Sequence, residues 1–528
     1  MTSGQTDSVD NAPEFNGRLA LLLAMAMFVL VVDTSIMNVS ISAVVHDLNS
    51  TVSNVQSAIA LEALVSAAFI LIGSKVGDLI GRKRAYVIGL LAYATGAIAM
   101  ALAQTILALI IFWAVIGGLG AALLLPAMQS LIHGNFRGAG QVRAYALVGA
   151  SAAIAAAVGP LLGGFITTFL SWRVAFLLEA VIIAIVLSGI KLVHDVPFTG
   201  SRVVDWGGSV LSVVGMGGIV LGILAWQEGF GAVGLLVAVG VLGLVGLAFW
   251  LRRRKRLGKA TLLDPGLFLS KYFRFGVTQQ LLQQIALGGT MIVLPIYLQI
   301  VFEYNALQAG LSIAPLSLTM FAVALLIGRR AGRYRPVTLI RWGFALLCLG
   351  LVVLIPLVPR ADSGWWLLVP LIIAGAGLGF LVSQLNNYTL SPISDERVSE
   401  AAGVNSAAGS FGLSFGLAFA GAIMLAALAP IFSSMATAST VLPEADQQQI
   451  VQTLEHDAQV VSNTQLEEQL ADQPQAVVDE VIRINTEARP IALQIALLVP
   501  LVAGLIGFGI TFRMSRLPEI AIKETVAL

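Results

Sequence analysis

Three carboxylic acids fall inside long apolar stretches of this sequence: Asp33, Glu62 and Glu179. Ionisable side chains at the depth of a membrane are rare and costly, so each of them is a candidate for function. Loss of hydration favours the neutral form of a carboxyl group, and a second carboxylate nearby favours it further. Such a group can hold a proton while the space beside it is empty and release the proton when a cation enters. The chemistry that these residues offer is therefore the exchange of protons for cations.

The first two acids are expected to share one cavity. Asp33 lies roughly 14 residues into an apolar stretch, about 20 Å from its start at the rise of a helix. Glu62 lies about six residues into the next stretch, so antiparallel neighbouring helices would bring both acids to a similar depth, in the outer half. The alternative is a structural acid held by hydrogen bonds, for instance Asp33 with Asn38 or with a neighbouring helix. Glu179 is expected nearer the outer surface, where it would simply reach water.

The elements that must position these acids are fourteen apolar stretches, each long enough to cross a hydrocarbon core of about 30 Å as a helix. A hydrophobic content of 58%, a charged content of 11% and a mean hydropathy of +0.90 exclude an ordinary soluble domain. If the stretches are spans, 26 of the 30 Lys and Arg residues fall on one side of them. The positive-inside rule then predicts a multi-pass protein of the cell membrane with both termini in the cytoplasm. The spans are expected at 19–42, 56–76, 86–104, 107–131, 145–170, 174–193, 207–226, 232–251, 275–301, 307–328, 338–358, 365–390, 404–430 and 491–512.

A short internal repeat indicates that the sequence has two related halves. Residues 72–84 (IGSKVGDLIGRKR) and 327–335 (IGRRAGRYR) are both basic turns spaced by glycines, and eight spans separate them. Two six-helix bundles with two extra spans between them would produce this offset, and such repeats are typical of secondary transporters. The expected divisions are a cytoplasmic tail at 1–18, an N-terminal bundle at 19–193, two inserted spans at 207–251, a C-terminal bundle at 275–512 and a cytoplasmic tail at 513–528.

One connection is much longer than the others. Residues 431–490, within the C-terminal bundle, are expected to form a long, acidic, extracellular hairpin. Apolar residues recur there at helical spacing, which predicts one or two amphipathic helices. These residues are Ile450, Val451, Leu454, Val477, Val478, Val481 and Ile482. A solvated hairpin and a functional lid or partner surface both remain open as interpretations.

The basic turn after the second span is the sharpest local motif, with the sequence GDLIGRKR at residues 77–84. Its glycines allow a tight turn, and its acid can accept bonds from a helix N-terminus or a basic side chain. The turn resembles the loop between spans two and three of the major facilitator superfamily, where it latches the two halves together on the cytoplasmic side. Ser74 stands in place of the first glycine of that family, and a merely topogenic loop is the alternative. The motif residues are Gly77, Asp78, Gly81, Arg82, Lys83 and Arg84.

A second motif, GPLLGG at residues 159–164, lies inside the fifth span. Its proline kinks the helix and its glycines allow close contact with a neighbour, so it could be a packing device. It also resembles the fifth-span signature of the superfamily's antiporters, which implies export. Segments 31–38, 205–206 and 294–310 resemble the fourteen-span drug:proton antiporter branch, the EmrB/QacA-like exporters. The motif residues are Gly159, Pro160, Gly163 and Gly164.

Two single residues and one residue pair depart from that branch. Ala114 stands where these exporters carry an arginine linked to proton transfer, and Glu62 replaces an aromatic residue. Gly409-Ser410 replaces an expected Arg-Gln pair. These changes remove positive charge and add negative charge, so the cavity should favour cationic or neutral lipophilic substrates. The proton path would then run through Glu62 rather than follow the relatives.

Other polar residues at helix depth are candidates to line a pocket, although hydrogen bonds between helices are the commoner use of such residues. The four His residues lack metal-ligand spacing and a partnered nucleophile, and no phosphate-binding loop is present. We therefore expect no enzyme activity, no metal and no cofactor. The candidate pocket residues are Asn38, Gln283, Gln284, Gln384 and Asn387.

The sequence thus predicts an all-α polytopic membrane protein with the major facilitator fold. The resemblance implies a proton-coupled exporter of lipophilic compounds, with cations favoured, that works by alternating access. Its expected partners are a small substrate, protons and membrane lipid but no nucleic acid, and it is expected to act as a monomer. Export of a lipid, a cell-envelope precursor or a specific metabolite is the alternative on the same fold. A membrane receptor that does not transport is a third hypothesis, which the intact motifs disfavour.

Overall fold

A computed structural model describes residues 16–195, 203–227, 231–328, 334–393, 397–441, 463, 467 and 473–518. Within these residues the chain is helical and contains no strand, as the sequence predicts. Among the described residues, thirteen stretches are long and apolar enough to cross a membrane. The expected sixth span, at 174–193, corresponds to α8, which is apolar but has only 17 residues. The predicted tail residues 1–15 and 519–528, and the apolar positions 450–454, lie outside the described residues.

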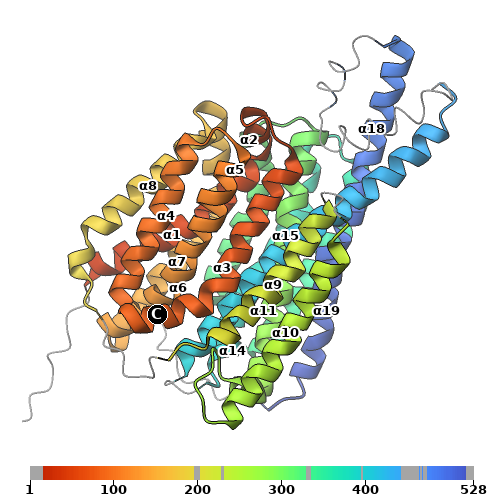
Figure 1. Ribbon diagram of the computed structural model, residues 1–528. Helices are drawn as coiled ribbons and strands as arrows, with labels where there is room; N and C mark the ends of the chain where they lie inside the picture. Colours follow the sequence, from red (N-terminus) through yellow and green to blue (C-terminus); the bar gives the residue numbers. More distant parts are fainter. Residues whose placement is uncertain are drawn as a thin grey trace, which may run out of the picture.

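The N-terminal helices gather on one side of the molecule, to the left in Figure 1. The π-helix η1 interrupts the fourth span, and both η1 and the following helix carry small residues where neighbours approach. The helices are α1 (Gly17–Val39), α2 (Ile41–Asp47), α3 (Val52–Ile80), α4 (Arg82–Leu102), α5 (Ile106–Ala108), η1 (Leu109–Gly117), α6 (Gly118–Asn135), α7 (Gly138–Phe169), α8 (Trp172–Ser188) and the 3-10 turn η2 (Ile190–Leu192).

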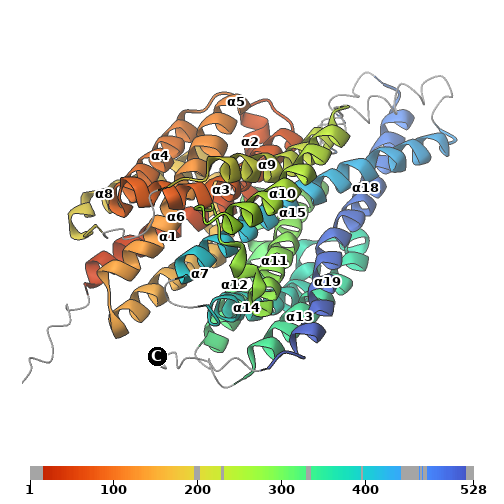
Figure 2. The ribbon, with the colours of Figure 1, turned by 60° about the horizontal axis from the view of Figure 1, so that its bottom comes forward.

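The remaining helices lie on the other side of the molecule, as the two ribbon views agree (Figures 1 and 2). The inserted pair, α9 and α10, packs together through glycines, and α9 lies against both α3 and α15. The helices are α9 (Trp206–Gln227), α10 (Val233–Arg256), η3 (Pro265–Leu269), α11 (Lys271–Ile296), the π-helix η4 (Tyr297–Val301), α12 (Ala306–Gly328), α13 (Pro336–Leu357), η5 (Val358–Arg360), η6 (Gly364–Leu367), α14 (Leu368–Leu390), α15 (Val398–Thr437), α18 (Gln475–Ala496) and α19 (Leu498–Met514).

Local sequence explains several helix ends. Thr51 caps α3, since its hydroxyl accepts the backbone N–H of Asn54 at 3.2 Å. Ser270 caps α11 in the same way, at 3.4 Å from the N–H of Phe273. Gly81 separates α3 from α4 with φ +100°, a conformation that side chains rarely adopt. This glycine therefore fixes the turn that the sequence predicted there.

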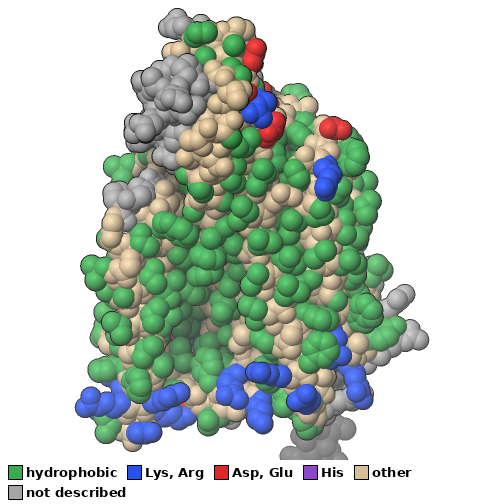
Figure 3. All heavy atoms as spheres, turned by 90° about the vertical axis from the view of Figure 1, so that its right-hand side faces the viewer, with side chains coloured by type: hydrophobic (Ala, Val, Ile, Leu, Met, Phe, Trp, Pro, Cys, Tyr) green, Lys and Arg blue, Asp and Glu red, His purple; other side chains and the backbone are tan. Residues whose placement is uncertain are grey.

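The two ends of the molecule differ in charge. Lys and Arg side chains form a band along the bottom of Figure 3. We call the end where α3 turns at Gly81 and α10 finishes in residues 252–256 the basic end, and the opposite end the far end. At the far end α15, with 40 residues, and α18 extend past the other helices (Figure 1).

The extension at the far end corrects the bounds of the predicted hairpin. The segment 431–490 is not a separate loop at its edges, because α15 continues to Thr437 and α18 begins at Gln475. The two helices bury a shared apolar face that includes Phe432, Val481 and Ile484. The amphipathic helix expected around residues 477–482 is thus confirmed, and it is continuous with the last span rather than separate from it.

At the basic end, a carboxylate ties the inserted pair to α15. Asp264 accepts hydrogen bonds from Lys255 Nζ and from Arg397 Nη2, each at 2.6 Å, and from the N–H of Gly266 at 2.7 Å. Partial burial would raise the pKa of Asp264, but the hydrogen bonds from Lys255 and Gly266 and the charge of Arg397 outweigh it. The pKa of this carboxyl group therefore lies below its usual range, and the group is ionised at neutral pH.

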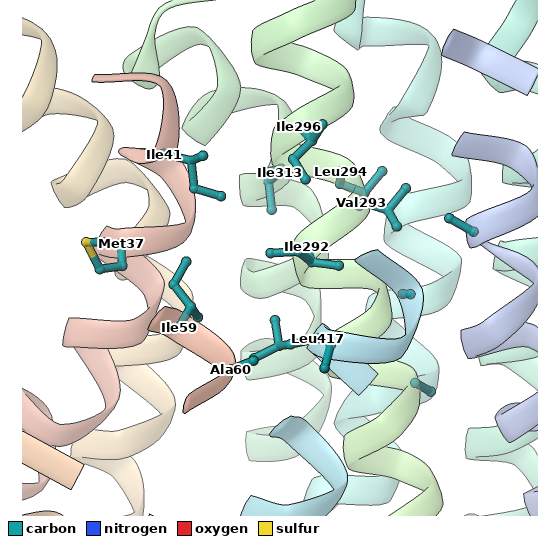
Figure 4. Close-up of a cluster of buried hydrophobic side chains, with 14 of the residues drawn as sticks. Met37, Ile41, Ile59, Ala60, Ile292, Val293, Leu294, Ile296, Ile313 and Leu417 are labelled. Carbon is teal, nitrogen blue, oxygen red and sulfur yellow. The ribbon is translucent and has the colours of Figure 1, made fainter. Parts of the chain in front are cut away.

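Toward the far end, the two sides of the molecule are joined by apolar packing and hydrogen bonds. Figure 4 shows Ile41 and Ile59 of the N-terminal side opposite Ile296 and Ile313 of the other side, in one buried cluster that also includes Met37. The backbone N–H of Ser42 donates to Gln299 Oε1 at 3.1 Å. The N–H of Leu307 donates to Thr168 Oγ1 at 3.0 Å, and Ser414 Oγ donates to the carbonyl oxygen of Ala60 at 2.6 Å. These contacts close the far end between the two sides.

Candidate functional site

Asp33 is buried on α1 and is held by two neutral donors. The indole Nε1 of Trp113 donates to both of its carboxylate oxygens, at 3.0 and 2.8 Å. The hydroxyl of Tyr93, on α4, donates to Oδ2. Trp113 lies in the π-helix η1, which carries its ring toward α1. Asn38, which the sequence suggested as a partner of Asp33, makes no such bond, and its Oδ1 is buried without a partner among the described residues.

The other two acids converge on Asp33 from different helices. Glu62 on α3 and Glu179 on α8 both lie within electrostatic reach of the Asp33 carboxylate. Tyr93 lies within reach of all three acids. The sequence expectation that Asp33 and Glu62 lie near each other is in agreement with this arrangement. Glu179 differs from expectation, because its side chain is only 2% exposed and does not reach water.

The cluster formed by Asp33, Glu62 and Glu179, called the acid cluster below, has no basic partner among the residues that the structure describes. The partners of Asp33 are uncharged, and no Lys or Arg contributes to the electrostatic surroundings of the two glutamates. Ala114, where the related exporters carry arginine, is completely buried next to Trp113. Within the described part of the chain, no basic side chain therefore balances the negative charge of the cluster.

The glycines of the fifth-span motif connect the helix of Asp33 to the other side of the molecule. A Cβ atom at Gly159 would lie 2.5 Å from Cβ of Ser35, and one at Gly163 would lie 2.8 Å from Cα of Ile36, both on α1. On the opposite face, a Cβ at Gly164 would lie 2.5 Å from the carbonyl oxygen of Ala306 on α12. The motif is thus a place where α1 and α12 both approach α7 closely.

The same close approach is repeated from the α12 side. A Cβ atom at Gly310 would lie 2.2 Å from the carbonyl oxygen of Pro160. No side chain larger than hydrogen fits at Gly164 or Gly310 without moving one helix away from the other. The motif therefore sets the distance between the two sides of the molecule.

The basic turn makes its contacts within the N-terminal side. Asp78 forms an ion pair with Arg82, whose Nη1 also donates to the carbonyl oxygen of Ser74 at 3.2 Å. The backbone N–H of Lys83 donates to Asp195 at 2.9 Å, and its Nζ donates to the carbonyl oxygen of Val193 at 2.7 Å. The predicted contact with the other side of the molecule is not among the hydrogen bonds of these described residues, so the latch role stays a prediction.

Nearby glycines explain the departure at Ser74. A Cβ atom at Gly73 would lie 2.3 Å from the carbonyl oxygen of Ala122, so Gly73 provides the close helix contact one residue earlier in the chain. Gly77 is also crowded, with Arg82 Nη1 3.2 Å from its ideal Cβ position. The carbonyl of Ser74 serves instead as an acceptor for Arg82.

The expected pocket residues of the C-terminal side are not brought to the acid cluster. Gln283 is buried, and its amide nitrogen lies 3.5 Å from Gln284 Oε1 on the same helix. Gln384 Nε2 lies 3.4 Å from Ser383 Oγ, and Asn387 is exposed. Gln283 and Gln384 therefore bond to neighbours on their own helices in the part of the chain that the structure describes.

Sequence reasoning missed three residues that matter for the acid cluster and the basic turn: Tyr93, Trp113 and Asp195. A signal existed for one of them. Seven of the eight Trp residues lie near the ends of the predicted spans, and Trp113 alone lies deeper, six residues after the start of the predicted span 107–131. A Trp at membrane depth needs an acceptor for its N–H, and a buried carboxylate is such an acceptor.

Comparison with known proteins identifies the class to which this fold and this site belong. The Major Facilitator Superfamily profile matches residues 23–417, and the chain belongs to this superfamily of transporters. It is similar to the probable transport protein HsrA of Haemophilus influenzae, with 26% identity, covering 81% of this chain and 90% of that protein. The puromycin resistance protein pur8 of Streptomyces alboniger is 28% identical, with 79% and 84% covered.

Solved structures agree at the level of the fold. A bacterial homologue of the human lysosomal transporter Spinster, solved in an inward-facing and unoccupied conformation, superposes with a TM-score of 0.62 at 13% identity. The match covers 96% of this chain and 99% of that one. The predicted family and transporter class are therefore confirmed, and the chain is a multi-pass membrane protein.

Proposed function

We propose that this chain is a proton-coupled exporter of lipophilic cations. Relatives include a protein named for resistance to puromycin, and the fifth-span motif at residues 159–164 resembles the signature of the superfamily's antiporters. Asp33 and Glu62 are the proposed cation-binding and proton-coupling residues. The substrate is a small molecule rather than a peptide or nucleic acid strand, and the transporter works by alternating access.

The observation that carries this proposal is the uncompensated charge of the acid cluster. Three carboxyl groups lie together, and in the described residues the donors around them are the neutral Tyr93 and Trp113. A buried charge costs several kcal/mol or more unless it is paired, so the cluster binds protons whenever no cation is present. Entry of a lipophilic cation offers the alternative pairing. Competition between the two is the physical basis of exchange.

The proposed topology has fourteen spans, with α8 as the sixth. Residues 19–193 form one six-helix bundle and residues 275–512 the other, with α9 and α10 inserted between them. The basic end faces the cytoplasm, as the band of Lys and Arg in Figure 3 supports, and both termini lie there. The far end, with the projecting α15 and α18, then lies outside.

The conformation described here is closed toward the outside in this topology. The bonds of Ser42 with Gln299 and of Thr168 with Leu307 lie at the far end. The basic turn bonds within its own bundle, through Asp78 and Lys83. In the opposite conformation this turn would be free to latch the bundles together on the cytoplasmic side.

Transport of ethidium, a lipophilic cation, into proteoliposomes with an imposed pH gradient tests the proposal. The wild-type protein should accumulate ethidium only when the gradient is present, and Asp33→Asn should abolish that dependence. Glu487→Gln removes an exposed acid from α18, 52% exposed, and should transport as the wild type does. Ethidium movement that ignores the gradient in the wild type would refute proton coupling. Absence of movement, together with altered export of an envelope lipid in a deletion strain, would refute the substrate class.

A further inference from the structure

We propose that Glu179 is the residue that stores the exchanged proton, in a site that it shares with Asp33. The inference rests on the proposed function and adds to it a third carboxyl group, Glu179 on α8. It also divides the roles within the acid cluster: Asp33 is the fixed anion, and Glu179 is the group whose proton is replaced when the cation binds.

The hydrogen bonds of the two acids support this division. Both oxygens of Asp33 accept bonds, from Trp113 and Tyr93. Both oxygens of Glu179 are buried and have no hydrogen-bond partner among the residues that the structure describes. A buried ionised carboxylate without donors is far more costly than a neutral carboxylic acid. In this conformation the proton of the pair therefore resides on Glu179, and the negative charge resides on Asp33.

The groups that face Glu179 come from each helix packed against α8. From α1 the charged group is Asp33, and from α4 the polar group is Tyr93, which also lies within reach of Glu62 on α3. From α7 the opposing stretch after Arg143 carries no charged side chain. On α8 itself, Arg173 lies toward the far end, where it pairs with Asp47.

Packing holds Glu179 in place without satisfying its oxygens. Phe176, one helical turn before it, lies edge-on to Trp113 with 6.3 Å between ring centroids. The same ring contacts Trp172 at 6.0 Å. These aromatic contacts therefore fix α8 against η1, whose Trp113 donates to Asp33. The carboxyl groups of Asp33 and Glu179 thus keep their relative positions when either one gains or loses a proton.

The site exchanges one proton for one monovalent cation. When a monovalent cation enters beside the cluster, the O–H bond of Glu179 breaks and its proton leaves to water. The Glu179 carboxylate then pairs with the cation, so the site gains one negative charge and one positive charge. When the cation departs, a proton from water restores the neutral acid. Tyr93, within reach of all three acids, can relay the proton between them because a hydroxyl both donates and accepts.

Proton release on ligand binding tests this inference directly. Purified protein in detergent and weak buffer is mixed with ethidium, and a pH-indicator dye records the protons that appear per ethidium bound. The wild type should release protons, and Glu179→Gln, which is isosteric and neutral, should release fewer by up to one per ethidium. Glu487→Gln is the matched control and should release as many as the wild type. In Glu179→Asp, the number of protons released per ethidium should depend on pH differently from the wild type.

The outcomes separate the two proposals. If Glu179→Gln binds ethidium and releases as many protons as the wild type, with the same pH profile, the inference is wrong and the proposed antiport stands. If the wild type binds ethidium and releases none, the proposed antiport is wrong and this inference falls with it. Should Glu179→Gln fail to fold, a Glu179→Asp profile identical to that of the wild type would equally overturn the assignment.

Discussion

The contact of α7 with α12 leads to a prediction about the balance between conformations. Gly164→Ala adds one methyl group where the structure leaves no room, because its Cβ would lie 2.5 Å from the carbonyl oxygen of Ala306 and 2.8 Å from Cα of Leu307. Carbon atoms make their best contacts at about 3.5–4.0 Å, so the two helices must separate by about 1 Å. This separation is needed only while the far end is closed.

The magnitude follows from the cost of overpacking. An extra methyl group in a well-packed interior costs about 1–3 kcal/mol. If the open conformation of the far end avoids the clash, the same energy shifts the balance roughly 5- to 150-fold toward that conformation. Gly164→Ala should therefore populate the conformation that is open at the far end, and a larger side chain at Gly164 should do so more strongly.

The rate of thiol labelling at the far end measures the shift. Cys348 is the sole cysteine of the chain, so a Cys348→Ala background allows a single reporter, Ser42→Cys, beside the bond to Gln299. Purified protein with Gly164→Ala should react faster with a bulky thiol reagent than the same protein without it. Gly149→Ala, also on α7, is the control, because its Cβ would meet nothing within 4 Å. Equal labelling in both glycine variants would refute the reasoning.

Two further predictions concern single hydrogen-bonded groups. Tyr93→Phe removes a bond to the Asp33 carboxylate and should lower the free energy of unfolding by about 1.5–3 kcal/mol, measured by thermal unfolding in detergent. Tyr86→Phe is its control, because the buried hydroxyl of Tyr86 has no partner among the described residues, and equal losses in both variants would contradict the prediction. Asp264→Asn weakens two partly exposed ion pairs and should cost about 0.5–1 kcal/mol at pH 7. Folding lowers the pKa of Asp264, so its contribution to stability is fully present above the ordinary pKa of 3.8 and is lost as the pH falls through the lower pKa of the folded state. A stability difference between Asp264→Asn and the wild type that already fades at pH 6 would contradict this prediction.

The membrane architecture could be predicted because it depends on properties that can be read along the chain. Hydropathy and the placement of Lys and Arg depend on short windows of sequence, and they gave helices that the structure reproduces within a few residues at most positions. The bounds failed where helices do not end at the membrane. Thr437 and Gln475 belong to helices that continue beyond the apolar window, and an apolar face shared by two helices stabilises them there.

The partners of the acids could not be predicted in the same way. Burial of Asp33 follows from its place in an apolar stretch, but its donors depend on the rotation of each helix about its axis. The π-helix around Trp113 changes that rotation for every residue after it, and no pattern in residues 109–117 predicts a π-helix there. Glu179 was placed too near the surface for a related reason: α8 begins at Trp172 and packs edge-on through Phe176, which draws the acid inward.

The distribution of the acids indicates how coupling would travel through the protein. Asp33, Glu62 and Glu179 all come from the N-terminal side, so a change of protonation alters the charge of that side alone. Two residues after Asp33, the side chain of Ser35 meets Gly159 on α7, and one residue further along α7 the carbonyl of Pro160 meets Gly310 on α12. These contacts leave no spare space, so a movement of α1 around a newly charged or neutralised acid must be taken up by α7 and then by α12. The glycines that permit close packing are thus also a direct mechanical route from the acid cluster to the other side of the transporter.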